Sequence, residues 1–391
     1  MSILIQGLSL QLCNVNNDKT NLQNILKKKI RIMKTPTTLA YAAKNYTGFS
    51  FIKSLVFVSL LLISNSLLAQ APFYANDPHL DKEVKEFLKA VNSGGTPVEQ
   101  LSKQDARNVL VNAQKAFKVD MSGVDISEKT IKADGYTLTL NIVRPTGIKG
   151  KLPAFIFIHG GGWILGDFPT HQRMVRDLSV LSGFVGIFVN YTPSPEARYP
   201  QAINEIYAAT KWVAAHGHEI NVDGDNLAIV GNSVGGNMST VTAIKAKENN
   251  GPKIRVQILM WPVVDANFET ESYKQFGQDR FLTTPLMKWM FDQYTTDENQ
   301  RKEIYISPLN ATVEQLKGLP PTLIQVAEND ILRDAAEDYG RKLNQAGVPV
   351  TTVRYNGTIH DFGLLNALAT QPSTRSAFVQ AAAELKKYLG K

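Results

Sequence analysis

The sequence predicts an α/β protein with a mostly parallel β-sheet that is covered by helices on both faces. From Leu152 onward, short apolar strands alternate with helical segments. Strands that are apolar along their whole length are typical of parallel sheets, because both faces of such sheets are buried. Two of these strands run directly into glycine clusters, "HGGGW" at residues 159–163 and "GNSVGGN" at residues 231–237. Glycine clusters at strand ends indicate sharp turns.

The expected elements follow in chain order. Residues 126–145 alternate between apolar and polar side chains around an Asp-Gly turn, which predicts a β-hairpin. The apolar strands are expected at residues 154–160, 184–191, 226–232, 256–263, 322–328 and 348–356. Apolar residues at helical spacing predict the intervening helices, which include Asn204–His216, Val234–Lys247, Ile331–Gln345 and Arg375–Leu389.

Two segments lie outside this alternation. Residues from about 76 to 118 show helical spacing with a Gly-Gly break, which predicts two helices. Residues 267–303 read as helical and are rich in aromatic residues, which are Phe268, Tyr273, Phe276, Phe281, Trp289 and Phe291. Aromatic side chains of this kind suit an apolar wall around a small ligand. For most of them individually, packing against the rest of the protein is the simpler interpretation.

Residues 1–69 have the composition of a secretory leader. They hold eight Lys and Arg residues against one acid, Asp18, which equals the whole formal net charge of +7. The remainder is therefore balanced, and the basic charge does not indicate a nucleic-acid partner. Lys53 precedes a mostly apolar run of about nine residues and a small-residue site at Ala69, which is the order of a signal peptide. This run is far below the roughly 20 residues needed to cross a bilayer, so no stable membrane anchor is expected.

The leader sets the expected boundaries of the working protein. Cleavage near Ala69 predicts an exported protein, periplasmic or secreted, with one catalytic domain at residues 70–391. Met33 is an alternative start, which would leave residues 1–32 as an upstream extension. Cys13 is the one cysteine of the chain, so the mature protein would contain no thiol and no disulfide.

Ser233 lies at the centre of the second glycine cluster, in a Gly-x-Ser-x-Gly pattern between a strand and a helix. Such a turn places a serine in a strained backbone conformation that lifts its hydroxyl clear of the sheet. A glycine turn that binds phosphate at a helix N-terminus is the alternative. Neither a G-x-G-x-x-G after the first strand nor a G-K-[ST] is present, which disfavours that alternative. The "HGGG" cluster supplies consecutive glycines whose N–H groups can approach a reacting carbonyl.

Six motifs in order carry a family resemblance: "HGGGW", "VNYTPSPEARYP", "GNSVGGN", "SPL", "AENDILRD" and "HDF". With them, the chain from about residue 75 to its end resembles the hormone-sensitive-lipase-like family of α/β-hydrolases, the bacterial carboxylesterases. The resemblance implies an α/β-hydrolase fold, with residues 76–118 and 267–303 forming a helical cap. It further implies a serine carboxylesterase that hydrolyses small, short-chain acyl esters through a covalent acyl-enzyme. No cofactor and no metal are implied.

The same resemblance assigns the site residues. Ser233 matches the nucleophile, Asp330 the acid of the triad and His360 the base. Asp334 is a rival carboxylate one helical turn after Asp330. The oxyanion donors would be the N–H groups of Gly161 and Gly162, together with that of Val234.

The sequence departs from the usual family wording at three places: positions 232 and 234, and "YTPSPE" at residues 191–196 where "YRLAPE" is usual. Asn232 stands where Asp is usual, which puts an electrostatic role at that position in doubt. Val234 stands where Ala is usual, and its bulk is expected to narrow the acyl site. Glu196 is expected to be structural, as a helix-start or ion-pair residue.

The histidines other than His360 have simpler interpretations. His159 is expected to hold the glycine loop. The remaining four are expected at surface or cap positions without metal-ligand spacing, and these are His79, His171, His216 and His218. Hydrolysis of a lactone, an amide or an acetylated sugar stays open as an alternative reaction. A ligand receptor without catalysis is the alternative from another functional class.

Overall fold

An eight-stranded sheet organises residues 74–390, which are the residues described by this computed structural model. The strand order is β1-β2-β4-β3-β5-β6-β7-β8, and all pairs from β4 to β8 are parallel. β1 and β2 form the antiparallel hairpin, and β2 pairs antiparallel with β4. The predicted leader, residues 1–69, lies outside the described residues.

The strands confirm the predicted hairpin and the six apolar strands. Their bounds are β1 Val124–Ala133, β2 Tyr136–Pro145, β3 Leu152–Ile158, β4 Val185–Asn190, β5 Val222–Asn232, β6 Ile254–Met260, β7 Thr322–Asn329 and β8 Val350–Ile359. The centre of the sheet is fully apolar: Ile156 of β3 pairs with Ile187 of β4 on one side and Ile229 of β5 on the other. All three side chains are buried. The parallel strands therefore form the core that holds the turns at their carboxyl ends.

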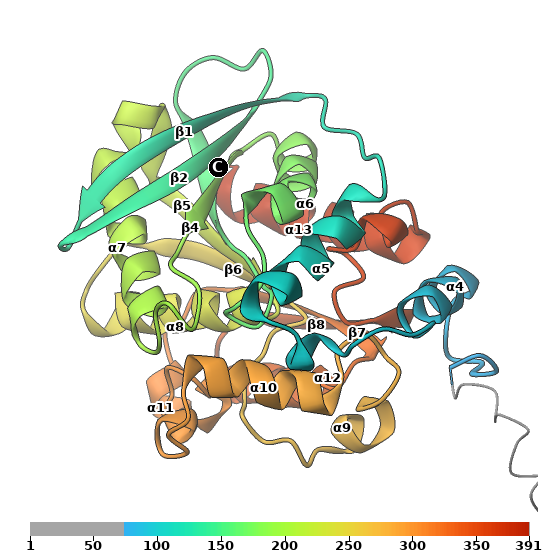
Figure 1. Cartoon of the computed structure of the whole chain (residues 1–391). Coiled ribbons are helices and arrows are strands. Elements are labelled where there is room, and N and C mark those ends of the chain that lie inside the picture. The colour runs from blue at the N-terminus through green and yellow to red at the C-terminus, as the bar shows by residue number, and fades with distance from the viewer. Residues whose placement is uncertain (1–73, 391) are drawn as a thin grey trace, which may run out of the picture. The chain divides into compact units, whose positions relative to one another are not determined.

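Helices cover both faces of the sheet (Figure 1). α6 (Phe168–Ser182) packs beside α13 (Pro372–Leu389), and α7 (Gln201–His216) packs beside α8 (Val234–Glu248). α12 (Arg333–Gln345) packs against β7 and β8, with the short α11 (Val313–Leu316) beside it. Within residues 74–390, no helix combines the length and apolar character needed to span a membrane.

α6 is a helix that the predicted helices did not include, although local signals for it are present. Asp167 caps its N-terminus in a capping box with Thr170, and Gly183 ends it in the left-handed conformation. Pro169 lies in its first turn. A glycine-rich stretch directly before it obscured the helical period. α13 likewise begins at Pro372, earlier than expected, because proline is well suited to a first helical turn.

The two segments outside the alternation lie at the carboxyl edge of the sheet. The first contains α4 (Lys82–Val91), the 3₁₀ turn η1 (Val98–Gln100) and α5 (Lys103–Lys115). The second contains only the short helices α9 (Glu271–Phe276) and α10 (Thr284–Tyr294) and the 3₁₀ turn η3 (Gln300–Lys302), joined by loops. η1 contacts α10, so the two segments meet although they are far apart in sequence.

Candidate active site

Ser233 occupies the sharp turn between β5 and α8. Its backbone has φ 54° and ψ −123°, a left-handed conformation that is costly for a residue with a side chain. Close approach of the backbones explains the flanking glycine at 235: a Cβ there would lie 2.0 Å from the carbonyl oxygen of Ile158. The serine N–H donates to Met260 O at 2.9 Å, and the serine carbonyl accepts from Val263 N at 3.1 Å. These bonds fix the turn against β6.

His360 and Asp330 converge on this serine. His360 Nε2 lies 3.0 Å from Ser233 Oγ, and His360 Nδ1 lies 2.7 Å from Asp330 Oδ2. The other oxygen of Asp330 accepts the N–H of Leu332 at 3.0 Å. All three side chains of this Ser–His–Asp set are almost completely buried. His360 follows β8 and Asp330 follows β7, so the parallel sheet brings three distant segments to one edge.

Asp334, the rival carboxylate, lies elsewhere. It belongs to the first turn of α12, where Oδ2 accepts the N–H of Ser272 at 2.7 Å. Its other oxygen accepts from Arg333 Nε at 2.9 Å. Asp334 therefore joins α12 to α9, and the structure brings Asp330 to His360 instead.

A second carboxylate, Asp361, lies on the other side of His360. Its Oδ2 is 3.8 Å from His360 Nε2, and its backbone has a φ of 57°. Burial lowers the pKa of His360, but the carboxylates of Asp330 and Asp361 raise it more, so the pKa lies above its ordinary value. The sequence reasoning missed Asp361, although the "HDF" motif placed a carboxylate directly after the histidine.

Asn232 has a clear function in holding this arrangement. Its Oδ1 accepts the N–H of Gly160 at 2.9 Å, and its Nδ2 donates to Asp361 Oδ1, also at 2.9 Å. Trp261 Nε1 donates to the same carboxylate oxygen at 2.5 Å. Asn232 therefore acts as donor and acceptor at once. The negative charge near His360 Nε2 is carried at position 361, not at position 232.

The glycine loop packs against aromatic rings. The ring of His159 stacks on Tyr191 at 4.2 Å between centroids, and Tyr191 Oη donates to the His159 carbonyl at 3.0 Å. Burial lowers the pKa of His159 to about 4, so the ring is neutral near pH 7. Trp163 is fully buried and stacks on Tyr294 of α10 at 4.4 Å. The glycine loop is thus attached to the second outlying segment.

His171 was expected at the surface or at a helix cap, and this expectation was wrong. It is completely buried on the inner face of α6, 5.3 Å from the ring of His159. Burial lowers its pKa well below the ordinary value. The reason is that α6 was not predicted, so the inward face of that helix was not recognised. His79, His216 and His218 are exposed, as expected.

A cavity of about 150 Å³ opens onto this Ser–His–Asp set. Ser233, His360 and Asp361 line it together with Gly161 and Gly162. The rest of its wall is apolar. Leu165 comes from the loop after β3, and the other side chains come from both outlying segments: Phe87, Val91, Val98, Ala106, Val109, Leu110, Ala113, Phe281, Leu282, Leu286 and Met290. The expectation that Val234 narrows this space was wrong, because its side chain is fully buried in α8 and does not line the cavity.

Glu196 joins the loop after β4 to α5. It forms ion pairs with Lys103 at 2.8 Å and with Arg107 at 2.7 Å, which agrees with the structural role expected for it. Hydrogen bonds from Arg107 and Lys103 lower the pKa of Glu196 to about 2. The Glu196 carboxylate therefore anchors α5 to the loop after β4.

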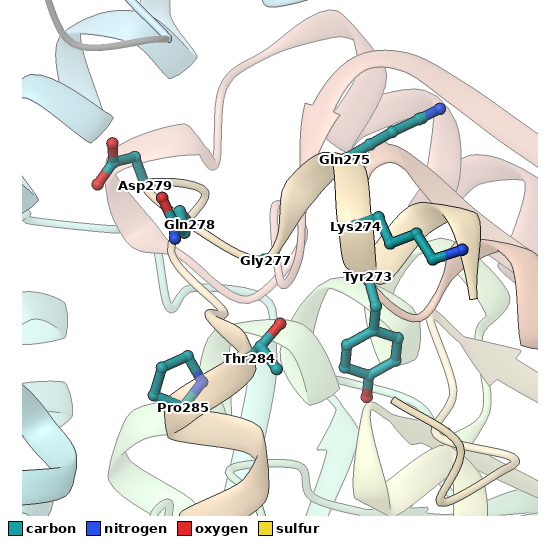
Figure 2. A pocket seen from close by; sticks show the side chains of 8 residues that line it. All are labelled: Tyr273, Lys274, Gln275, Gly277, Gln278, Asp279, Thr284 and Pro285. Atoms are coloured by element: carbon teal, nitrogen blue, oxygen red, sulfur yellow. The ribbon is translucent and has the colours of Figure 1, made fainter. Parts of the chain in front are cut away.

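A second hollow, of about 520 Å³, lies between α9 and the start of α10 (Figure 2). Its side chains do not converge: Lys274 and Gln275 point to one side, and Gln278 and Asp279 lie on the other. None of its lining residues is Ser, Cys or His. Within residues 74–390, no group of three or more His, Cys, Asp or Glu side chains is placed to hold a metal ion.

Comparison with known proteins agrees with this fold. A profile of the α/β-hydrolase fold family matches residues 155–364. A thermostable esterase from Pseudomonas putida ECU1011, known from its crystal structure, is 59% identical with a TM-score of 0.79, covering 80% of this chain and 99% of that one. A carboxylesterase of Mycobacterium tuberculosis is 31% identical over 68% of this chain and 83% of its own length. An ethyl acetate hydrolase of Pseudomonas putida is 29% identical over 72% and 92%.

The chain belongs to the hormone-sensitive-lipase-like family of α/β-hydrolases. It is a carboxylic ester hydrolase, with a small-molecule ester as substrate.

The charge of Asp361 provides a first prediction. Asp361→Asn keeps an oxygen for Asn232 and Trp261 but removes the negative charge near His360 Nε2. Because that charge stabilises the protonated ring, the pKa of His360 should fall. An NMR titration of the His360 ring measures the change, with the exposed Asp338→Asn as the matched control. An unchanged or higher pKa of His360 would contradict the electrostatic role of Asp361.

Proposed function

We propose that this chain is a serine carboxylesterase that hydrolyses short-chain acyl esters through a covalent acyl-enzyme. The observation that carries the proposal is the hydrogen-bond chain from Ser233 Oγ through His360 to Asp330, with distances of 3.0 and 2.7 Å. A serine hydroxyl is a weak nucleophile by itself. A neighbouring base that is oriented by a third group is the arrangement that activates it.

In the proposed acylation step, His360 Nε2 takes the proton of Ser233 as Oγ attacks the ester carbonyl. Asp330 holds the ring in the tautomer with Nδ1–H and stabilises the imidazolium that forms. His360 then gives its proton to the leaving alcohol. In deacylation, His360 takes a proton from water as the water oxygen attacks the acyl-enzyme carbonyl, and the acid is released as His360 returns the proton to Ser233 Oγ.

The oxyanion would be held by the N–H groups of Gly161, Gly162 and Val234. Gly161 and Gly162 line the cavity beside Ser233, which supports their role. Val234 is the first residue of α8, and an N–H at this position has no acceptor within its own helix. Losing one such donor typically costs about 3 kcal/mol, roughly a hundredfold in rate.

The cap is part of the proposal. Residues 76–118 and 267–303 contribute most of the apolar wall above Ser233, which supports their acting together as a cap over the substrate. The cavity of about 150 Å³ is smaller than the roughly 300–1,000 Å³ of pockets for drug-sized ligands. This size and the apolar lining favour short acyl esters over long-chain lipids.

Export is proposed from the leader sequence, with cleavage near Ala69. The basic stretch, the short apolar run and the small residues support it. N-terminal sequencing of the protein outside the cytoplasm tests it: a chain that begins near Gln70 is expected, and an uncleaved, membrane-retained chain would contradict it.

Ser233→Ala tests the nucleophile. The variant should fold and should lose at least about 10⁴-fold in kcat, because the triad acts as a unit. An organophosphate should label Ser233 of the wild type, as mass spectrometry of the peptides will show. The exposed Ser127→Ala in β1 is the control and should retain full activity. Turnover retained by Ser233→Ala, or a label on another serine, would contradict the assignment.

The acyl-chain preference tests the cavity. Each methylene that the apolar wall accommodates adds about 0.8 kcal/mol, or about fourfold in kcat/KM, until the space is filled. The profile from acetyl to palmitoyl esters should therefore have its maximum at short chains. Leu286→Ala should move the maximum to longer chains, whereas Val379→Ala, in the exposed part of α13, should not.

A maximum at long chains, or a jump in activity on emulsified substrate, would contradict the short-chain assignment and indicate a lipase. The same purified protein should be assayed on lactone, amide and acetylated-sugar panels. A higher kcat/KM on any of these would replace the acyl ester as the preferred substrate, and no turnover on any panel would favour the ligand receptor.

A further inference from the structure

Gln114 joins three segments that are far apart in the sequence. It lies in the last turn of α5, and only 4% of its surface is exposed. Its Nε2 donates to Thr170 O of α6 at 2.7 Å and to Leu364 O at 2.9 Å. Its Oε1 accepts the N–H of Asn366 at 2.9 Å. Both polar atoms of the side-chain amide are therefore used, and each contact is with a backbone group.

The segment that Gln114 holds is the one that carries the base. Leu364 and Asn366 follow His360 by four and six residues. The N–H groups of Leu364 and Leu365 donate to the carbonyl of Asp361 at 2.8 and 3.0 Å. These two hydrogen bonds close a tight turn. A shift of Leu364 would therefore also displace residues 360 and 361.

Asn366 also contacts α5 through its own side chain. Its Nδ2 donates to the backbone carbonyl of Gln114 at 3.0 Å, which satisfies an acceptor in the last turn of α5. Its Oδ1 accepts from Arg173 Nε at 3.0 Å. Arg173 also donates to Leu364 O at 2.8 Å and is paired with the buried Asp177. The loop is thus held between α5 and α6.

The opposite end of α5 is attached to the glycine loop. Arg107 lies two turns before Gln114, and its Nε donates to Ile164 O at 2.9 Å. Its Nη2 donates to Ser194 O at 3.0 Å. The face of α5 that includes Ala106, Leu110 and Ala113 lines the cavity. The same helix therefore forms the substrate wall and contacts the loops on both sides of Ser233.

We propose that Gln114 is a positioning residue for His360: through Leu364 and Asn366 it sets the placement of the base against Ser233 and Asp330. This inference rests on the proposed role of His360 as the base. A wall residue that merely packed against substrate would change KM. A positioning residue changes kcat, because a misplacement of about 1 Å in a reacting group can cost 100-fold in rate.

Gln114→Met tests the proposal, because it keeps the length of the side chain and removes all three amide hydrogen bonds. We expect kcat to fall about tenfold or more, with KM changed less than about threefold. The acidic limb of the kcat/KM profile should move to lower pH, because a displaced ring loses its close contact with Asp330. Gln104→Met is the matched control on the exposed side of α5, and its kcat and pH profile should equal those of the wild type.

Asn366→Ala removes the side-chain hydrogen bonds of Asn366 to Gln114 O and from Arg173 Nε, and it tests the same junction if Gln114→Met does not fold. The two variants remove different hydrogen bonds of the same junction, so the double variant should lose less kcat than the product of the two single losses. Active sites are counted by organophosphate titration, so kcat refers to folded protein. Wild-type kcat and pH profile in the single variants, or a loss confined to KM, would overturn the positioning role.

Ser233→Ala is assayed in parallel to separate the two proposals. If it remains active, the proposed catalytic function is wrong, and the role of Gln114 has no basis. If it is inactive while Gln114→Met and Asn366→Ala turn over like the wild type, the positioning role alone is wrong.

Discussion

The sharp turn at Ser233 is the constraint on which the rest of this structure depends. A residue with a side chain in a left-handed conformation costs about 1–3 kcal/mol, and the surrounding structure must enforce it. The left-handed conformation of Ser233 is held by β5, in the buried centre of the sheet, and by the hydrogen bonds of Ser233 to Met260 and Val263. The small residue at 235 allows the start of α8 to touch the end of β3. The strain is therefore supported by the buried centre of the sheet.

A second constraint is electrostatic. Two carboxylates, Asp330 and Asp361, flank a buried histidine, and each would be costly to bury without donors. The carboxylate of Asp330 accepts the N–H of Leu332, whereas the carboxylate of Asp361 accepts hydrogen bonds from Asn232 Nδ2 and Trp261 Nε1. Asn232 also accepts the N–H of Gly160. It therefore connects Asp361, next to His360, to the glycine loop. One hydrogen-bond network therefore positions both the Asp361 carboxylate and the glycine loop.

Local patterns in the sequence were enough to predict the sheet, because the apolar strands and the Asp-Gly hairpin are set by short-range periodicity. The glycine clusters likewise predicted where Ser233 and the glycine loop lie, since both depend on turns within a few residues. The buried position of His171 could not be predicted once α6 was missed. The partners of Asp361 and Gln114 could not be predicted either, because they lie 129 and 250 residues away in the sequence. Single-sequence patterns contain no information on such contacts.

In the proposed mechanism, Ser233 attacks an ester whose oxyanion faces the glycine loop while its acyl chain enters the cavity lined by α5 and α10. A crystal structure of the protein inactivated with a short-chain alkyl phosphonate tests it most directly. The account predicts phosphorus bonded to Ser233 Oγ, with the phosphonyl oxygen within hydrogen-bond distance of the nitrogens of Gly161, Gly162 and Val234. The alkyl chain should contact the apolar wall that Leu110 and Leu286 help to form. An adduct on another residue, or a phosphonyl oxygen directed away from these three nitrogens, would contradict the account.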